Sequence, residues 1–387
     1  MKIPIARTKL TEKEFNIIRK PLESGWLVQG EFVKDFENKF SDFTGIKHSI
    51  AVTSCTTALH LSLSALGFKN NDEAIVPAFT WISSANVVEH LGGNVIFCDI
   101  DLKTFNIDVN QIENLITPKT RAIIPVHLFG LASNMEEIMT IAKKYNLWVV
   151  EDAACGFGAQ YKGNHVGSFG ETGCFSFHPR KAITTGEGGM ITTNDDNLAE
   201  RLRSLRDHGA SKSDFQRHHS ERPYLLADHP YAGFNYRMTD IQASIGTTQL
   251  GRAKGIINER REIAKLYSKN LKLLEFFQLP FENKNYFHGY QSYPCIYDVK
   301  KIEPNQVGMT NKKRNRFMED LQKEGVATRP ATHAVHMLKY YRKKYDLKPD
   351  DYPNAKIAND CSLSFPIYNG LDKNAQKYVI KTIKANL

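Results

Sequence analysis

The run Leu147-Trp-Val-Val-Glu-Asp-Ala-Ala-Cys155 joins an apolar segment directly to two acids. Its first four residues form a short apolar run, which predicts a strand buried inside a sheet, and two acids follow at once. A carboxylate that ends a buried strand is costly to bury unless it meets a cation. Asp152 is therefore a candidate binding residue, although an Asp in this place is also typical of a cap on a turn or helix.

Similar apolar runs flank this stretch and alternate with helical patterns over the first 240 residues. This alternation predicts an α/β fold with a central, mostly parallel sheet. The predicted strands are 49–52, 74–76, 95–98, 122–126 and 147–150, and the predicted helices include 56–66 and 134–144. A capping box formed by Ser133 and Glu136 is expected to begin the second of these helices.

The pattern changes near Thr239, where a long helix-rich stretch begins. A strand-like run at 293–297 follows, then an amphipathic helix at 311–323 and a last helix with Asp372 as its N-cap. The sequence thus predicts a large α/β domain at 1–240 and a smaller C-terminal α+β domain at 241–387. A polar, aperiodic segment at 210–231 is expected to be a long surface loop.

Composition places the chain among ordinary globular proteins, with 387 residues, 41% apolar and 24% charged. No apolar run approaches the roughly 18 residues of a membrane span, and the first residues lack the pattern of a signal peptide. We expect a cytoplasmic protein that does not enter membranes. Its six cysteines show no metal-ligand spacing, so we expect reduced thiols and no metal site.

The net charge of +9 allows two interpretations. The basic runs at 311–316 and 339–344 are typical of solvated helix faces, and their scatter argues against nucleic-acid binding. The alternative is attraction of an anionic small substrate such as a nucleotide diphosphate.

Three features lie at the ends of predicted strands, where open α/β sheets bind ligands. Asp152 could pair with a protonated pyridine nitrogen. Lys181, flanked by Phe175, Phe177 and Ile183, could be desolvated enough to act as a nucleophile, although most single lysines are simply solvated. The hydroxyls at 53–57 precede a helix and could hold a phosphate, although plain capping would also explain them.

Together these features supply what pyridoxal phosphate (PLP) requires: a phosphate cradle, an acid for the ring nitrogen and a lysine for the aldehyde. They occur in chain order at successive strand ends, which chance rarely provides. The sequence therefore predicts a PLP enzyme.

These residues resemble the DegT/DnrJ-type sugar aminotransferases, a branch of the aspartate aminotransferase (fold type I) PLP enzymes. The resemblance runs from residues 24–30 to 363–366. Its most specific stretches are 151–154, 175–177 with Lys181, 186–189 and 233–240.

The resemblance implies a role for each matching residue. Lys181 is the catalytic residue, which bonds the cofactor aldehyde and then carries a proton. Asn235 is expected to reach the cofactor phosphate of a neighbouring subunit, giving a homodimer with shared active sites. The other implied cofactor contacts are Asp152 at the ring nitrogen, Trp81 stacked on the ring, Thr56 and Ser176 at the phosphate with the backbone N–H groups of Cys55 and Thr56, and Cys155 beside the phenolic oxygen.

Two of these positions depart from the commonest family pattern. Cys55 stands where the family usually has Gly. Cys155 stands where many members have Gln or His, and a thiol is a weak hydrogen-bond donor.

The reaction implied is transfer of an amino group from L-glutamate to a keto sugar, with a nucleotide-linked 4-keto-6-deoxyhexose as the leading acceptor. The product would enter surface polysaccharide, lipopolysaccharide or glycan synthesis. A keto-inositol or an eight-carbon sugar acid is the alternative acceptor. A PLP enzyme of different chemistry, such as a sugar dehydratase, is another alternative; relatives that carry His in place of the lysine are dehydratases, whereas this chain keeps Lys181. A regulatory, DNA-binding protein on the same scaffold is a further alternative.

Substrate contacts are expected from the 210–231 loop and from Arg237, Arg329 and His333. For these three residues, a structural ion pair or a plain surface position is an equally good interpretation.

Overall fold

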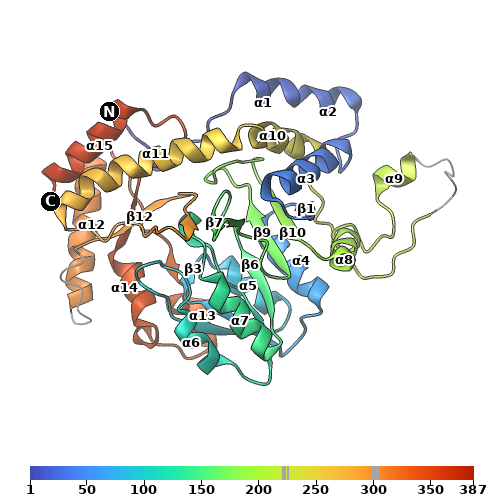
Figure 1. The fold of residues 1–387 in the computed structure, drawn as a ribbon, viewed down its shortest axis with the longest axis horizontal. Helices are drawn as coiled ribbons and strands as arrows, with labels where there is room; N and C mark the ends of the chain where they lie inside the picture. Colours follow the sequence, from blue (N-terminus) through green and yellow to red (C-terminus); the bar gives the residue numbers. More distant parts are fainter. Residues whose placement is uncertain (220–223, 225, 299–305) are drawn as a thin grey trace.

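The structure, a computed structural model, describes residues 1–219, 224, 226–298 and 306–387 (Figure 1). Within these residues the central sheet has seven strands. In spatial order they are β1 (His48–Val52), β10 (Gly189–Thr193), β9 (Thr172–Ser176), β6 (Trp148–Asp152), β5 (Thr120–Ile123), β2 (Glu73–Pro77) and β4 (Asn94–Cys98). β10 runs antiparallel to both of its neighbours, whereas the pairs from β9 to β4 are parallel.

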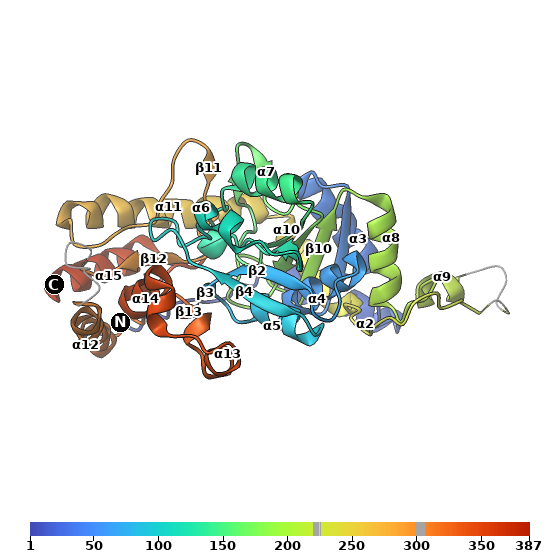
Figure 2. The ribbon, with the colours of Figure 1, turned by 90° about the horizontal axis from the view of Figure 1, so that it is seen from below.

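Both faces of the sheet are covered by helices, because successive strand residues point to opposite sides. On β6, Val150 packs into one apolar cluster with α4, α5 and α8, and Val149 packs into another with α3, α7 and α10. Figure 2 shows α5 and α7 on opposite sides of β2 and β4. These helices are α3 (Glu31–Thr44), α4 (Cys55–Leu66), α5 (Ser83–His90), α7 (Met135–Tyr145), α8 (Asp196–Arg206) and α10 (Asp240–Leu250).

A third apolar cluster forms the core of the C-terminal part of the chain. It lies among α11 (Ala253–Leu271), α12 (Val307–Lys323), α15 (Lys373–Ala385) and the antiparallel pair β12 (Tyr293–Ile296) and β14 (Ser362–Phe365). Ile3, from the other end of the chain, packs into the same cluster. Both termini accordingly lie beside α11 and α15 in Figure 1.

Shorter elements complete the described fold. They are α1 (Glu12–Ile17), α2 (Arg19–Ser24), α6 (Val109–Ile112), α9 (Asp214–His218), α13 (Lys339–Lys344), α14 (Pro353–Cys361), β3 (Phe79–Thr80), β7 (Gln160–Tyr161), β8 (Asn164–His165), β11 (Tyr286–Phe287) and β13 (His333–Ala334). The predicted fold class is confirmed: a large α/β part with a mostly parallel sheet and a smaller α+β part. The boundary between 240 and 241 stays a prediction.

Of the two predicted helix N-caps, one is confirmed and one is wrong. Asp372 caps α15 as predicted, accepting hydrogen bonds from the backbone N–H groups of Asn374 and Ala375. The capping box at Ser133 is wrong: α7 has Asn134 as its N-cap, and the Ser133 hydroxyl instead donates to the carbonyl of Val126 at 2.9 Å. A tertiary hydrogen bond therefore outcompetes the local cap.

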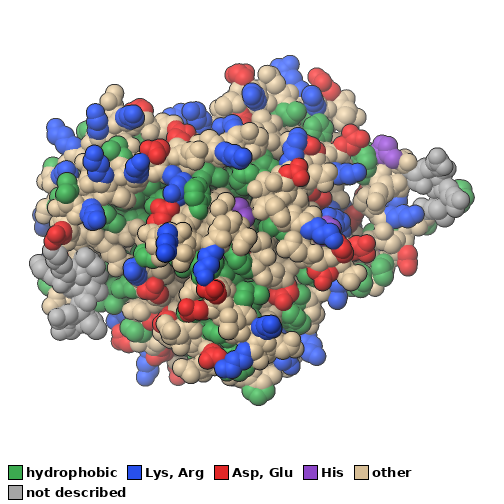
Figure 3. Space-filling model, viewed as in Figure 1, with side chains coloured by type: hydrophobic (Ala, Val, Ile, Leu, Met, Phe, Trp, Pro, Cys, Tyr) green, Lys and Arg blue, Asp and Glu red, His purple; other side chains and the backbone are tan. Residues whose placement is uncertain are grey.

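The basic run at 311–316 lies on α12, as expected of a helix face, but Arg314 is only 4% exposed. Its guanidinium donates to the carbonyl of Ser362 at 2.9 Å, so this one residue is a core contact and not part of the solvated face. On the face shown in Figure 3, Lys and Arg side chains are interspersed with acidic ones. Among the described residues, no helix is long and apolar enough to cross a bilayer.

The segment 210–231 projects from the body and carries the short helix α9 (Figures 1 and 2). Its described residues are otherwise irregular, as predicted for a surface loop, and 220–223 and 225 lie outside the described residues.

Candidate active site

Asp152 is the last residue of β6 and is 4% exposed. Its carboxylate accepts hydrogen bonds from the hydroxyl of Ser84 at 2.6 Å and from the backbone N–H of Ala154 at 3.0 Å. Within the described residues, no Lys, Arg or His forms an ion pair with it. A buried carboxylate with two neutral donors and no cation is the arrangement that a protonated ring nitrogen would complete.

Glu151, the neighbouring acid, points to the opposite face of the sheet, because strand residues alternate. Its carboxylate accepts hydrogen bonds from His127 Nε2 at 2.8 Å and from the backbone N–H groups of Gly167, Phe169 and Gly170 at 2.7–2.9 Å. All of these donors come from the protein, so Glu151 is a structural anchor. Glu151 thus has a structural role, whereas Asp152 has no cationic partner among the described residues and is available to a ligand.

Lys181 lies in the turn that follows β9 and is half-buried. Its backbone N–H donates to the carbonyl of His178 at 2.8 Å. Its Nζ lies 3.2 Å from Cys155 Sγ, and Cys155 follows Asp152 by three residues. The geometry therefore brings the amine of Lys181 to the end of β6, where the carboxylate of Asp152 also lies.

The N-terminus of α4 forms the next wall of this site. Ser54 caps the helix by accepting the backbone N–H of Thr57 at 3.1 Å, and Thr56 donates its hydroxyl to Ser83 at 3.0 Å. The first backbone N–H groups of a helix lack partners within the helix and attract anions. This corner therefore suits a phosphate group.

Gly189 lies between the N-terminus of α4 and Ser176. It pairs with Val52 on one side and with Ser176 on the other, so these three residues lie side by side at the sheet edge. A Cβ on Gly189 would lie 2.4 Å from the backbone carbonyl atoms of Ser54 and 2.8 Å from the backbone nitrogen of Cys55. Only glycine lets α4 approach so closely, and it thereby brings Ser176 near the helix terminus.

Cys55 fills the space beneath the first turn of α4. Its thiol lies 3.3 Å from the carbonyl of Cys174, the residue that pairs with Asp152 across β9 and β6. Burial, reinforced by the charge of Asp152, raises the pKa of the Cys55 thiol. The thiol is therefore a packing group, and the fold accommodates Cys in place of the family's usual Gly.

Trp81 lies at the mouth of the site, with 55% of its surface exposed. It directly follows β3, which pairs with β13 so that Thr80 faces His333. The rings of Trp81 and His333 lie 5.7 Å apart, between centroids, at an angle of 46°. His333 is thus brought beside Trp81, and its role in substrate binding stays a prediction.

The remaining predicted residues are Asn235, Arg237 and Arg329, and the backbone of Arg237 pairs with Val52 at the end of β1. Asn235 is exposed and pairs by its backbone with Asp207, while Arg237 forms an ion pair with the carboxylate of Asp207. Arg329 is exposed and lies in a recess beside α12. The ion pair of Arg237 is the contact that the structural alternative describes, and the substrate roles of Arg237 and Arg329 stay predictions.

The structure thus gathers most of the predicted cofactor residues at one edge of the sheet. The gathered residues are Cys55, Thr56, Trp81, Asp152, Cys155, Ser176 and Lys181. Their donor set fits PLP: a helix terminus for the phosphate, a buried carboxylate for the ring nitrogen and an amine for the aldehyde. In the described part of the chain, no group of His, Cys, Asp and Glu is arranged to hold a metal ion.

The sequence alone missed Ser84 and could not say what Gly189 packs against. Ser84 lies three residues after Trp81, and only the placement of the first turn of α5 in the folded chain brings its hydroxyl to Asp152. Gly189 belongs to a stretch that the resemblance singles out, but its role depends on the close approach of α4.

Three comparisons with known proteins cover almost the whole chain. A model of the DegT/DnrJ/EryC1/StrS aminotransferase family matches residues 8–384. GDP-perosamine synthase of Escherichia coli O157:H7 is 37% identical over 385 residues, which are 98% of this chain and 97% of that protein. GDP-perosamine synthase of Caulobacter vibrioides is 38% identical over 372 residues, which are 96% of this chain and 94% of that protein.

Solved structures agree with these sequence matches. The PMP-form of the putative sugar aminotransferase Spr1654 from Streptococcus pneumoniae superposes with a TM-score of 0.91 at 26% identity, covering 100% of this chain and 99% of that one. The PLP-form of the same protein gives a TM-score of 0.90 and covers 98% of that chain.

Proposed function

The chain belongs to the DegT/DnrJ/EryC1/StrS aminotransferase family, and from this premise we propose that it moves the amino group of L-glutamate onto a keto sugar linked to a nucleoside diphosphate. It is a PLP-dependent sugar aminotransferase, which confirms the predicted family, cofactor and enzyme class. The acceptor we favour is a 4-keto-6-deoxyhexose whose aminated product enters surface polysaccharide or glycan synthesis.

The choice of acceptor is supported by the names of two relatives. Both GDP-perosamine synthases, at 37% and 38% identity, are named for a GDP-linked amino sugar. The net charge of +9 is of the sign that would attract such an anionic substrate. All six cysteines are free, which suits a reducing compartment, and we propose that the enzyme works in the cytoplasm.

The proposal rests on one geometric observation: a lysine amine and a buried carboxylate both lie near the end of β6. Lys181 Nζ lies 3.2 Å from Cys155, which follows Asp152 by three residues. When bound, PLP supplies an aldehyde and an electron-withdrawing ring that eases removal of a proton from the substrate carbon.

Lys181 is the catalytic residue of this proposal. Its Nζ would hold the cofactor aldehyde and, once freed, the amine would carry the proton removed from the substrate carbon. Asp152 would keep the ring nitrogen protonated, and Ser84 fixes the carboxylate of Asp152 by its 2.6 Å hydrogen bond. Cys155, whose Sγ lies 3.2 Å from Lys181 Nζ, would place its thiol beside the phenolic oxygen.

Binding and orientation fall to the other gathered residues. Thr56, Ser176 and the first backbone N–H groups of α4 would hold the phosphate, and Trp81 would cover the ring. Asn235, exposed beside Asp207, reaches the phosphate in a second copy of the chain, so the working enzyme is a homodimer. 2-Oxoglutarate leaves before the sugar binds, and ping-pong kinetics follow.

The test is an assay of the purified holoenzyme with L-glutamate and a GDP-linked 4-keto-6-deoxyhexose. We expect 2-oxoglutarate to form together with an aminated nucleotide sugar, and parallel lines when initial rates are plotted reciprocally. Lys181→Ala is the inactive control, and Lys20→Ala, an exposed position on α2, is the matched control that keeps full activity.

The acceptor panel also includes a keto-inositol and an eight-carbon keto sugar acid. Turnover of either one, without turnover of any nucleotide-linked sugar, would refute the proposed acceptor while leaving the aminotransferase intact. Loss of water from the sugar without consumption of glutamate would identify a dehydratase instead.

A further inference from the structure

Lys181 belongs to a loop, here called the lysine loop, that runs from Phe177 after β9 to Gly189 at the start of β10. The carbonyl of Phe177 closes the base of this loop. It accepts hydrogen bonds from the hydroxyl of Thr184 at 2.6 Å and from the backbone N–H of Thr185 at 3.0 Å. The placement of the lysine amine therefore depends on how the base of the loop is held.

A buried glutamine of α10 holds this base from outside the loop. Gln249, in the last turn of α10, is 2% exposed, and its Oε1 accepts the backbone N–H of Thr184 at 3.0 Å. Because this bond requires an acceptor, it fixes the amide oxygen toward the loop and turns the amide nitrogen away. That nitrogen, Nε2, has no hydrogen-bond partner among the described residues. The polar contact of Gln249 is thus directed at the lysine loop.

A second glutamine of α10 contacts a later part of the same loop. Gln242 Nε2 donates to the carbonyl of Glu187 at 2.8 Å. Gln242 and Gln249 lie about two helical turns apart, so their side chains share one face of α10. Ile183 of the loop is buried in the apolar cluster to which Leu250 of α10 also belongs. This face of α10 therefore lies against the lysine loop.

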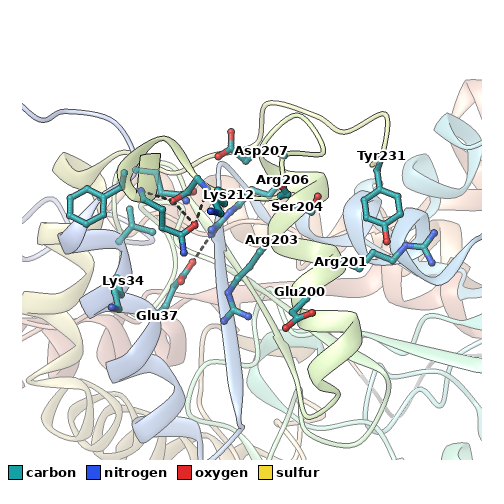
Figure 4. Close-up of a pocket in the computed structure, with 18 of the residues that line it drawn as sticks. Lys34, Glu37, Glu200, Arg201, Arg203, Ser204, Arg206, Asp207, Lys212 and Tyr231 are labelled. Carbon is teal, nitrogen blue, oxygen red and sulfur yellow. Dashed lines mark hydrogen bonds and ion pairs between the residues drawn. The ribbon is translucent and has the colours of Figure 1, made fainter. Parts of the chain in front are cut away.

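α10 is itself anchored to the sheet through α3. The carboxylate of Asp240, at the start of α10, accepts the backbone N–H of Gly30, the N-cap of α3, at 2.8 Å. Glu37 of α3 accepts the backbone N–H of Ala51 in β1 at 2.8 Å and pairs with Arg206 of α8, in the wall of a pocket between α3 and α8 (Figure 4). The helix that holds the loop is therefore a fixed support.

We propose that Gln249 is a positioning residue for amino transfer, because its hold on Thr184 fixes the loop that carries Lys181. The inference rests on the proposed catalytic role of Lys181. A buried backbone N–H that loses its acceptor costs free energy, so a loop without the oxygen of Gln249 would open to give Thr184 another partner. Displacing a reacting group in this way lowers the rate of the chemical step, whereas the groups that bind the substrates stay in place.

Two substitutions separate the amide oxygen from the rest of the side chain. Gln249→Met keeps a similar length and removes the acceptor, whereas Gln249→Glu keeps Oε1 and replaces the unpartnered nitrogen. Arg252 and Arg260 line the same recess as Gln249, so the new carboxylate would have cations nearby. Gln376→Met is the matched control, because Gln376 is 3% exposed and donates to the carbonyl of Ile263 in α11, outside the lysine loop.

Hydrogen exchange of the full chain, measured with and without cofactor by mass spectrometry of peptides, observes the loop directly. The peptide that covers 177–189 should exchange roughly tenfold faster in Gln249→Met, the value of one buried hydrogen bond. Gln249→Glu and Gln376→Met should leave its exchange within about twofold of the unchanged protein. The measurement without cofactor does not involve the chemistry of Lys181, so it tests the hold on the loop by itself.

Kinetics of the holoenzyme with L-glutamate and the nucleotide-linked keto sugar give the second measurement. Gln249→Met should lower kcat by roughly tenfold and leave both KM values within about threefold, because the amine is displaced and the binding groups are not. Gln249→Glu should recover most of kcat, and Gln376→Met should retain it. A merely structural role would predict equal effects of the two methionine variants.

The proposal would be overturned by any of three results. These are unchanged exchange of the 177–189 peptide in Gln249→Met, equal losses in Gln249→Met and Gln249→Glu, or an unchanged kcat in Gln249→Met. If the unchanged protein transfers no amino group while exchange responds as expected, the proposed function fails and the hold of Gln249 on the lysine loop stands.

Discussion

Replacing Ser84 by alanine should destabilise the cofactor-free protein through a single contact. The hydroxyl of Ser84 donates to the carboxylate of Asp152 at 2.6 Å, and Asp152 is 4% exposed. Removing that donor leaves the buried carboxylate with the backbone N–H of Ala154, at 3.0 Å, as its remaining close donor among the described residues. The perturbation is therefore confined to one charge-assisted hydrogen bond.

The expected magnitude follows from the charge on the acceptor. A hydrogen bond to a charged group contributes about 1.5–3 kcal/mol, whereas one between neutral groups contributes about 0.5–1.5 kcal/mol. Ser84→Ala should thus lower the free energy of unfolding by about 2 kcal/mol. In an Asp152→Asn background the same change should cost about 1 kcal/mol, so the two positions should show a coupling energy of about 1 kcal/mol.

The assay is urea unfolding of the cofactor-free protein at one fixed protein concentration, because a dimer's apparent stability depends on concentration. Ser64→Ala is the matched control, since its hydroxyl donates to the carbonyl of His60 within α4 and has no part in the site. The reasoning would be refuted if Ser84→Ala cost the same in the unchanged protein and in the Asp152→Asn variant. That result would show that the hydroxyl does not act through the carboxylate.

Three further outcomes follow from other contacts. Gly189→Ala should displace α4, because its Cβ would lie 2.4 Å from backbone atoms of Ser54; it should cost about 1–3 kcal/mol of unfolding free energy and weaken cofactor retention. Gly255→Ala, in α11 with nothing within 4 Å of the added Cβ, should be neutral or stabilising by up to about 1 kcal/mol, and equal losses in both variants would contradict this. Burial lowers the pKa of His165 from 6.5 to about 4, so the unfolded chain takes up the proton first. The contribution of His165 to the free energy of unfolding should be complete above about pH 6.5 and should fall by up to about 3 kcal/mol as the pH falls to about 4. A series of denaturation curves between these pH values should show this decline, and an equal decline in His165→Gln would contradict it. Trp81→Ala, at 55% exposure, should change the unfolding free energy by less than about 1 kcal/mol yet speed loss of the cofactor on dialysis, and unchanged retention would remove Trp81 from the site.

The strand ends were the predictable part of this molecule. Asp152 and Lys181 each follow a short apolar run, and parallel strands bring their carboxyl ends to one edge. The sequence could therefore indicate both residues before any contact was known. The chemistry of these two residues depends on their residue type and on their position after a strand. Both properties can be predicted from the neighbouring sequence.

Contacts between distant segments could not be predicted in this way. Ser84 reaches Asp152 across 68 positions, and nothing in its neighbourhood distinguishes it from an ordinary helix serine. Ser133 shows the opposite case. Its local sequence pattern favours an N-cap, but its hydroxyl donates a hydrogen bond to the carbonyl of Val126 instead. Arg314 sits in a basic run typical of a solvated face, yet it reaches the carbonyl of Ser362 in the core. In each case tertiary geometry decides between two locally reasonable contacts.

Borohydride reduction of the holoenzyme, followed by proteolysis and mass spectrometry of the peptides, identifies the amine that binds PLP. Reduction fixes the cofactor to whichever amine holds its aldehyde. We expect one modified peptide, with the added mass on Lys181. A modified lysine elsewhere in the chain, or a holoenzyme that yields no modified peptide, would show that Lys181 does not bind the cofactor.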